Sequence, residues 1–512
     1  MKFLVPVVSL LSLFVTTASR ADAAGSPDAP SRGVALDNVV VTANRIPTDR
    51  ARVGTATYVM TAEEIELRQY RFVLDALRGI PGVTISQNGG LGGFASARIR
   101  GAASAQTLVR IDGVVVNDPT SPAGGFDFAN LDTSDVETIE VYGGPQSTMY
   151  GSDAMGGVVN IVTRSVASAS SLSGYAEGGS YGTRRFQVES GGRLNRFGYR
   201  VSANHVKADG FSRADEADGN VENDAYESLT LSGRLSADFS ERLSLLLTGR
   251  YLDTESGIDN FGGPGGDALG LLSEMQQTSA GAALNAEGFG GRLDQTLTLR
   301  YLETETAIDA FSFATQGEQS TVEYQGVYEF ANDYRMLFGA EYEEQSVADP
   351  NGFAPKREID STGLFAMLQF APIDGLDLTA GVRRDDYETG GAAAREDFAA
   401  RNTVQLTGAW RVPNADTIIR ASWGQGFRAP TIFQLSAVFP PATEPNTNLR
   451  SETGDGWDIG MEHRFGLWDL NVQLTYFRIE TNNLIKFGNG RYENIDSTRR
   501  KGLEFTMQAA LT

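Results

Sequence analysis

Cysteine is absent from all 512 residues of the chain. This absence excludes a disulfide framework, a cysteine-ligated zinc site and a thiol nucleophile. Histidine is nearly absent too, with only His205 and His463, which argues against a histidine-based active site. The mean hydropathy of −0.23 predicts no bundle of transmembrane helices. Basic residues are also few, since 43 Lys and Arg face 65 Asp and Glu, so a nucleic-acid partner is not expected.

The first 23 residues have the pattern of an export signal peptide. Lys2 precedes a largely apolar run over 3–15, which is shorter than the roughly 20 residues that a membrane-spanning helix needs. Ala21-Asp22-Ala23 fits the small-residue cleavage rule. We therefore expect cleavage after Ala23, with Ala18 as a weaker option and a buried N-terminal helix as the alternative.

Residues 24–36 are Ala, Gly, Ser, Pro and Asp for the most part and are expected to form a flexible leader. Beyond it, short helical and strand patterns alternate up to about residue 165. The capping box Thr61-Ala62-Glu63-Glu64 predicts a helix start, and a second helix is expected over 71–78, before Gly79 and Pro81. Strands are expected at 83–85, 97–100, 108–111, 114–116, 138–141 and 158–162. These patterns predict a small α+β domain.

From about residue 171 onward, apolar and polar residues alternate with a period of two. Leu376, Leu378, Ala380 and Val382 form one face of a strand whose other face is Asp377, Thr379, Gly381 and Arg383. Strands of about ten residues with apolar outer and polar inner faces are typical of membrane barrels, although a soluble β-sandwich also alternates. About sixteen candidate strands are joined by connections that alternate between short and long, and this alternation favours an all-β transmembrane barrel.

A β-branched segment follows the leader: Asp37, Asn38, Val39, Val40, Val41, Thr42 and Ala43. A short strand without a neighbour of its own can add to the edge of another protein's sheet; an ordinary first strand is the alternative. The segment resembles the TonB box of TonB-dependent outer-membrane transporters, in the form found in vitamin B12 (cobalamin) receptors.

Five further motifs resemble the plug domain of that family, in the expected order: 75–83, 99–101, 108–113, 139–141 and 143–161. The resemblance implies a plug domain over 44–165 inside the lumen of a β-barrel over 166–512. It also implies a set of plug-motif residues, namely Arg100, Gly101, Asp112, Gly113, Glu140, Gly144, Pro145, Tyr150, Gly151 and Asn160. In the barrel, 426–430 and 448–452 resemble a further family signature.

Two charges fall in apolar strand patterns of the plug region, at Arg100 and Glu140. A buried charge needs a partner, so we expect plug–barrel or intraplug ion pairs; solvated charges are the alternative. The family's barrels have 22 strands and typically end in an aromatic residue, whereas this chain ends at Thr512. With about sixteen strands present, we expect a truncated chain or a degenerate gene product.

The resemblance implies active transport rather than an enzyme, with no catalytic residue, in the outer membrane of a Gram-negative bacterium and in contact with its lipid. An extracellular ligand would dock on plug apex loops near 86–94 and 117–129, with Gln87, Asn88, Asn117 and Asp118 as candidate contacts. The box would then bind TonB, which acts with the inner-membrane ExbB/ExbD complex. Cobalamin is the first candidate ligand and a ferric siderophore the second; a passive porin-like channel or an adhesin is the alternative from another class.

An acidic loop over 209–227 contains Asp215, Asp218 and Asp224. Carboxylate oxygens suit Ca²⁺, and the resemblance implies calcium-ordered loops in cobalamin receptors. We therefore expect these three residues to be calcium ligands, with a solvated, self-repelling loop as the alternative. No other cofactor is expected.

Overall fold

The computed structural model describes residues 40–213, 222–259, 271–308, 313–351, 356–391, 397–437, 441, 444–446, 448–466, 470–495 and 497–509. They all belong to one compact unit, Asp37–Thr512. The predicted signal peptide and leader lie outside the described residues, as do Asp37, Asn38 and Val39 of the predicted box.

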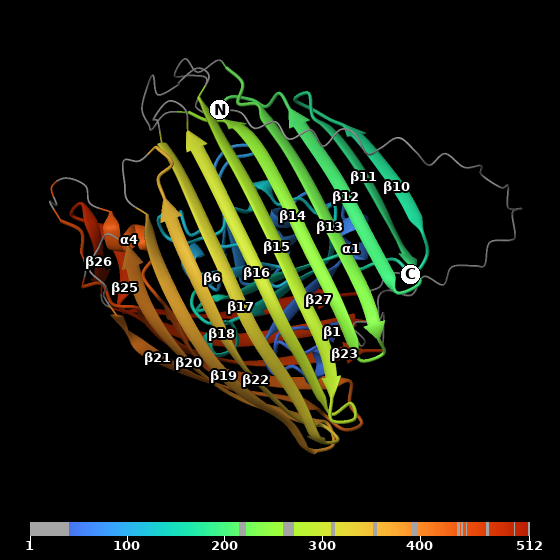
Figure 1. The fold of residues 1–512 in the computed structure, drawn as a ribbon. Coiled ribbons are helices and arrows are strands. Elements are labelled where there is room, and N and C mark those ends of the chain that lie inside the picture. The colour runs from blue at the N-terminus through green and yellow to red at the C-terminus, as the bar shows by residue number, and fades with distance from the viewer. Residues whose placement is uncertain are drawn as a thin grey trace, which may run out of the picture. The chain divides into compact units, whose positions relative to one another are not determined.

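A sixteen-stranded antiparallel sheet forms the larger part of this unit and curves around the N-terminal domain (Figure 1). Each strand pairs with the next in sequence order, and the predicted number of strands is confirmed. No pairing joins β27 to β10 among the described residues. The strands are β10 (Ser171–Gly178), β11 (Arg184–Leu194), β12 (Phe197–Ala208), β13 (Tyr226–Ser240), β14 (Leu243–Gly257), β15 (Leu272–Gly288), β16 (Leu293–Ile308), β17 (Phe313–Ala331), β18 (Tyr334–Ala348), β19 (Arg357–Ile373), β20 (Leu376–Gly391), β21 (Asp397–Arg411), β22 (Thr417–Arg428), β23 (Glu452–Phe465), β24 (Leu470–Asn482) and β27 (Thr498–Gln508).

The two faces of this sheet differ as the alternation predicts. On β20, Val382 is 54% exposed on the outer face, whereas Asp377 and Arg383 are buried on the inner face. On β24, Leu474 is exposed and Thr475 is buried. An outer apolar band therefore surrounds a polar lumen, as in membrane barrels.

No helix within the described residues is both long and apolar enough to cross a membrane.

The N-terminal domain contains a five-stranded mixed sheet in the order β3-β8-β9-β6-β7, in which only β6 and β9 are parallel. Its strands are β3 (Thr57–Thr61), β8 (Val136–Gly143), β9 (Gly157–Thr163), β6 (Thr107–Ile111) and β7 (Val114–Val115). Two small hairpins accompany it: β1 (Val40–Val41) with β2 (Thr48–Asp49), and β4 (Val83–Gln87) with β5 (Ala95–Ile99). A third hairpin, β25 (Leu484–Gly488) with β26 (Arg491–Ile495), belongs to the barrel loops.

The helices are short: α1 (Ala62–Leu67), α2 (Val73–Arg78), α3 (Ser147–Tyr150) and α4 (Ile432–Ser436), with 3₁₀ turns η2 (Arg50–Arg52), η3 (Ser104–Gln106) and η4 (Phe128–Asn130). The predicted capping box is confirmed, because the Thr61 hydroxyl accepts a hydrogen bond from the Glu64 amide. Helix α2 begins two residues later than predicted because Phe72 is extended and bridges to Asp132. The predicted strand 97–100 ends at Ile99, since Arg100 adopts a positive φ of 51°.

Candidate functional site

The predicted box begins the described chain as strand β1, and among the described residues this strand pairs only with β2. Val41 and Ala43 are buried. A few residues later, the Arg52 guanidinium donates to Asp333 at 2.7 Å, in the tight turn between β17 and β18. The segment that follows the box therefore reaches the rim of the barrel where connections are short.

Thr42 is held to the plug sheet by a group of side-chain hydrogen bonds. Its amide and hydroxyl donate to Glu140 Oε2 at 3.3 and 2.9 Å. Asn160 Nδ2 reaches both the same carboxylate oxygen and the Thr42 hydroxyl at 3.0 Å. Glu140 on β8 and Asn160 on β9 are cross-strand partners, so adjacent strands place both groups beside the box.

Tyrosines complete this environment. The Tyr142 hydroxyl donates to the Glu140 carboxylate, and the Tyr150 hydroxyl donates to the Thr42 carbonyl at 2.7 Å. Burial raises the pKa of Tyr150 to about 12, so its hydroxyl keeps its proton as a donor. Glu140 has no ion-pair partner among the described residues, so the expected ion pair is wrong there. Neutral donors satisfy the buried carboxylate instead, and the solvated alternative is excluded by burial.

Arg45, directly after the box, reaches the barrel wall. Its guanidinium lies 3.0 Å from Glu323 on β17 and 3.4 Å from Glu341 on β18. The ring of Phe365 packs against it, with the ring centroid 4.6 Å away. Arg45 closes the run of residues that resembles the box, but its carboxylate partners on the barrel could not be predicted from the sequence.

A second arginine, the half-buried Arg110, lies near this group without a carboxylate in contact among the described residues. Its guanidinium donates to the Gly113 carbonyl at 2.9 and 3.2 Å and lies over the Tyr150 ring. Burial, followed by repulsion from Arg300 and Arg45, lowers the pKa of Arg110 to about 10. Arginines and carboxylates of plug and barrel therefore both lie near the box.

Arg100 joins the plug to the other side of the barrel. Its guanidinium binds Glu504 through two hydrogen bonds of 2.8 Å and Asp458 through one of 2.9 Å. All three side chains are at most 3% exposed. The expected plug–barrel ion pair of Arg100 is therefore present, and a solvated charge is excluded. A side chain at Gly143 would place its Cβ 2.8 Å from the guanidinium carbon, so this site needs a glycine beside Arg100.

The other predicted plug-motif residues shape the backbone around these contacts. Asp112 and Gly113 both have positive φ in the β6–β7 turn, as a type I′ hairpin turn requires. Pro145 lies against barrel strands at Gly424 and Gly456. Gly101, Gly144 and Gly151 also have positive φ, and Gly151 ends α3.

The predicted apex loops lie against long barrel loops at the opposite rim. Arg213, after β12, donates to the Leu91 carbonyl at 2.7 Å. Near α4, Thr431 donates to the Pro122 carbonyl and Arg428 to the Ala123 carbonyl, both at 3.3 Å. Each apex loop is thereby tied to a different group of barrel loops.

The four predicted ligand contacts have different environments. Asn117 is buried. Its side-chain oxygen accepts a hydrogen bond from the Val109 backbone N–H, and its side-chain nitrogen donates to the Thr107 and Gly124 carbonyls, all at 2.8–3.1 Å. This side chain therefore supports the plug rather than facing a ligand. The Asp118 carboxylate accepts hydrogen bonds from the backbone N–H and the hydroxyl of Thr120, and burial raises the pKa of this carboxyl group. The side-chain nitrogen of Gln87 donates a hydrogen bond to the Gly90 carbonyl, and its side-chain oxygen accepts one from the Arg78 guanidinium. Asn88 lies in the loop, where its backbone N–H donates a hydrogen bond to the Phe94 carbonyl.

Exposed aromatic side chains, not predicted from the sequence, also lie at this rim. Phe94 is 51% exposed, Tyr181 61% and Phe211 42%, and the rings of Tyr181 and Phe211 lie 5.1 Å apart. Phe211 also borders the apex loop at Gly90. Single aromatic residues in a sequence do not indicate a binding site, because only the fold brings them together at one rim.

The acidic loop is described only in part, since Asp215 and Asp218 lie outside the described residues. Asp224 is buried and accepts a hydrogen bond from the Arg213 amide at 2.7 Å. Carboxylate oxygens of Glu222, Asp224 and Asp259 lie within 4.8 Å of one another. This set of hard oxygen donors fits Ca²⁺ chemistry.

Comparison with known proteins matches both domains. The model of the TonB-dependent receptor plug domain matches residues 49–158, and that of the TonB-dependent receptor-like β-barrel matches 167–512. The chain is 28% identical over 495 residues to the vitamin B12 transporter BtuB of Vibrio vulnificus, covering 92% of this chain and 75% of that protein. It is 27% identical over 481 residues to BtuB of Photobacterium profundum, with the same coverage.

Solved siderophore receptors share the fold. The siderophore receptor PirA of Pseudomonas aeruginosa is 21% identical, with a TM-score of 0.68, covering 88% of this chain and 81% of that one. A mutant ferric enterobactin receptor, PfeA, of the same organism in complex with enterobactin is 20% identical, with a TM-score of 0.71, covering 88% and 78%.

Proposed function

Because the chain belongs to the TonB-dependent receptor family, we propose that it imports a scarce, bulky nutrient across the outer membrane of a Gram-negative bacterium. The family is one of receptors and transporters, not of enzymes. The single observation that carries the proposal is the placement of the two ends of the plug. Its apex loops contact the long barrel loops, whereas Arg52, in the segment after the box, contacts the rim with short turns.

In the proposed cycle, ligand binding at the apex loops changes the packing of the plug sheet. Thr42 is held by Glu140 and Asn160, which belong to that same sheet, so a shift of β8 against β9 weakens the hold on the box. The freed strand then pairs with TonB in the periplasm by strand addition. TonB, driven by the proton gradient through ExbB/ExbD, pulls the plug open.

Vitamin B12 is the ligand that we propose first. The two BtuB relatives match nearly the whole chain, whereas the siderophore receptors support the fold alone. The exposed aromatic rings of Tyr181 and Phe211 suit the apolar parts of a corrin ring. A ferric siderophore is the alternative ligand.

Uptake in cells that lack their own receptors tests this assignment. Cells expressing the chain are expected to accumulate radiolabelled cyanocobalamin at least tenfold above cells with an empty vector, and only when TonB is present. Ferric enterobactin, supplied in parallel, is expected to stay at background. TonB-dependent uptake of ferric enterobactin instead of cobalamin would reverse the ligand assignment, and uptake of both without TonB would contradict active transport.

We also propose that Ca²⁺ orders the acidic loop, held by Asp224 with Glu222 and Asp259. Calcium is expected to tighten cyanocobalamin binding by about 1–3 kcal/mol, as is typical of coupled sites. Isothermal titration of the purified receptor with Ca²⁺ alone, and with cyanocobalamin at both calcium levels, measures the effect. Asp224→Asn is expected to remove most of it, whereas Asp209→Asn, a nearby carboxylate outside the cluster, is expected to keep it. Equal cobalamin affinity with and without Ca²⁺ would reject the site.

A further inference from the structure

The outer face of strands β10 to β13 carries a groove of 460 Å³ whose lining is mainly apolar. These four strands form one edge of the large sheet (Figure 1). The outward-facing apolar residues that line the groove are Gly174, Ala176, Phe186, Val188, Ala203 and Leu229. The proposed transport cycle does not use this groove, because it lies on the face of the sheet opposite the plug.

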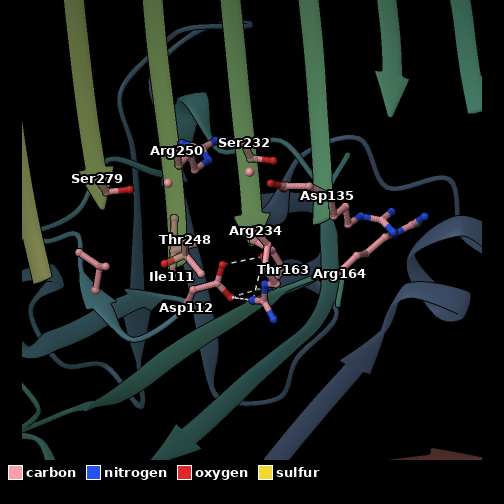
Figure 2. A pocket seen from close by; sticks show the side chains of 14 residues that line it. Ile111, Asp112, Asp135, Thr163, Arg164, Ser232, Arg234, Thr248, Arg250 and Ser279 are labelled. Atoms are coloured by element: carbon pink, nitrogen blue, oxygen red, sulfur yellow. Dashed lines mark hydrogen bonds and ion pairs between the residues drawn. The ribbon is translucent and has the colours of Figure 1, made fainter. Parts of the chain in front are cut away.

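Contacts of the same strands with the plug fix the orientation of the groove. On β11, the side chain of Gln187 donates to the Ser134 carbonyl of the plug at 2.9 Å. On β13, Arg234 binds Asp112 of the plug (Figure 2). Side chains one position away point to the other face of the sheet, and Phe186, next to Gln187, is accordingly 56% exposed. The groove therefore lies in the outer apolar band, which faces lipid in a membrane barrel.

Small side chains create the groove. Ala203 on β12 pairs with Val188 on one side and Leu231 on the other, so a methyl group lies between two larger side chains. On β10, the partner of Val188 is Gly174, which has no side chain. A concave apolar surface gives an acyl chain more contacts than a flat barrel wall does.

Two exposed cations lie at the end of the groove nearer the long loops. Arg184 and Lys207 are cross-strand partners, two positions beyond the partners Phe186 and His205. Lys207 Nζ donates to Glu227 at 2.5 Å, and His205 Nε2 lies 2.9 Å from the same carboxylate group. Arg184 makes no ion pair among the described residues, so its guanidinium is available to an anion.

On the next strands, β14 to β18, the exposed charged side chains near the same rim are mainly acidic. They include Glu255, Glu274, Glu305 and Glu344. An anionic headgroup is repelled by these carboxylates and attracted by the cations of β11 and β12. Guanidinium and ammonium groups both bind phosphate, and arginine can do so through two parallel hydrogen bonds. Charge therefore favours a phosphate at the upper end of the groove.

We propose that the groove binds an acyl chain of a phosphorylated lipid from the outer leaflet of the outer membrane, with the phosphate against Arg184 and Lys207. The chain lies over Ala203 along the apolar band, while Lys207 shares its ammonium group between the phosphate and Glu227. This inference goes beyond transport and requires only that the barrel spans the outer membrane.

Diphosphoryl lipid A serves as the probe, and native mass spectrometry of the purified full chain in detergent micelles measures its binding. The double variant Arg184→Glu, Lys207→Glu is expected to bind the probe roughly tenfold more weakly, because two attractive charges become repulsive. The matched control is Arg478→Glu, Lys501→Glu, which reverses a cross-strand pair on β24 and β27 and is expected to stay within about twofold of wild type. Any other pattern overturns the phosphate contact.

The acyl contact is tested separately. Ala203→Trp fills the groove and is expected to weaken lipid A binding roughly tenfold, as when about two methylene groups lose their apolar contact. Ala280→Trp, at an exposed alanine on the outer face of β15, is the control and is expected to bind as wild type does. Displacement of the lipid by inorganic phosphate alone, or equal binding by Ala203→Trp and wild type, would show that the groove holds no acyl chain.

If one of these variants does not fold, Ala203→Cys decides, because the chain has no native cysteine. Lipid A must slow the reaction of this cysteine with a thiol reagent and leave Ala280→Cys unaffected; equal protection of both, or of neither, rejects the site. Absence of TonB-dependent uptake by the wild type would contradict the proposed function but would leave these binding results unchanged.

Discussion

Val40→Pro is expected to reduce energised uptake to the level of cells that lack TonB, while ligand binding stays within about twofold of wild type. Strand addition uses backbone N–H groups of the added strand, and proline removes one of them and is not accommodated inside a sheet. Among the described residues, β1 pairs only with the two residues of β2, so the substitution is expected to disturb little else. Uptake of labelled ligand and equilibrium binding to whole cells separate the two effects.

The matched control is Val40→Thr, which keeps both the β-branched shape and the backbone donor. It is expected to transport normally. If Val40→Pro and Val40→Thr transport equally well, the box is not the coupling element. Uptake that persists in that case would favour a passive channel.

Arg100→Ala is expected to loosen the plug by about 3–5 kcal/mol, the usual cost of breaking a buried charge pair from one side. The substitution leaves Asp458 and Glu504 buried without their cation. Faster hydrogen exchange of the plug amides and increased leakage of large antibiotics through the barrel are the expected results. Both report on the plug rather than on the barrel strands.

Arg98→Ala is the control, because Arg98 lies two residues earlier on β5 and is exposed. It is expected to leave exchange and leakage unchanged. The triple variant Arg100→Met, Asp458→Asn, Glu504→Gln removes all three charges together and should recover much of the lost stability. Equal exchange in Arg100→Ala and Arg98→Ala would show that this ion pair does not hold the plug.

Local sequence patterns predicted most secondary structure. The alternation of side chains along strands such as β20 and β24 indicated which residues face outward, because a strand's period of two is independent of its partners. The capping box at Thr61 predicted the start of α1 because the cap involves only residues three positions apart. The order of the motifs predicted a plug followed by a barrel, and both family models match it.

The partners of the buried charges could not be predicted in this way. Arg100 and Glu504 are 404 positions apart, and Arg45 and Glu341 are 296 apart, so no local spacing relates them. Glu140 was expected to pair with a cation, but strand pairing of β8 with β9 brings Asn160 beside it instead. Asn117 was expected to face a ligand, whereas the turn after β7 directs its amide to the plug backbone.

The sequence by itself determined the class of fold, the faces of the strands and the family. The tertiary structure decided which charges meet and how Thr42 is held. The physical reason is that hydrophobic periodicity acts between neighbours in the chain. The contacts between plug and barrel instead depend on how one folded domain is oriented inside another.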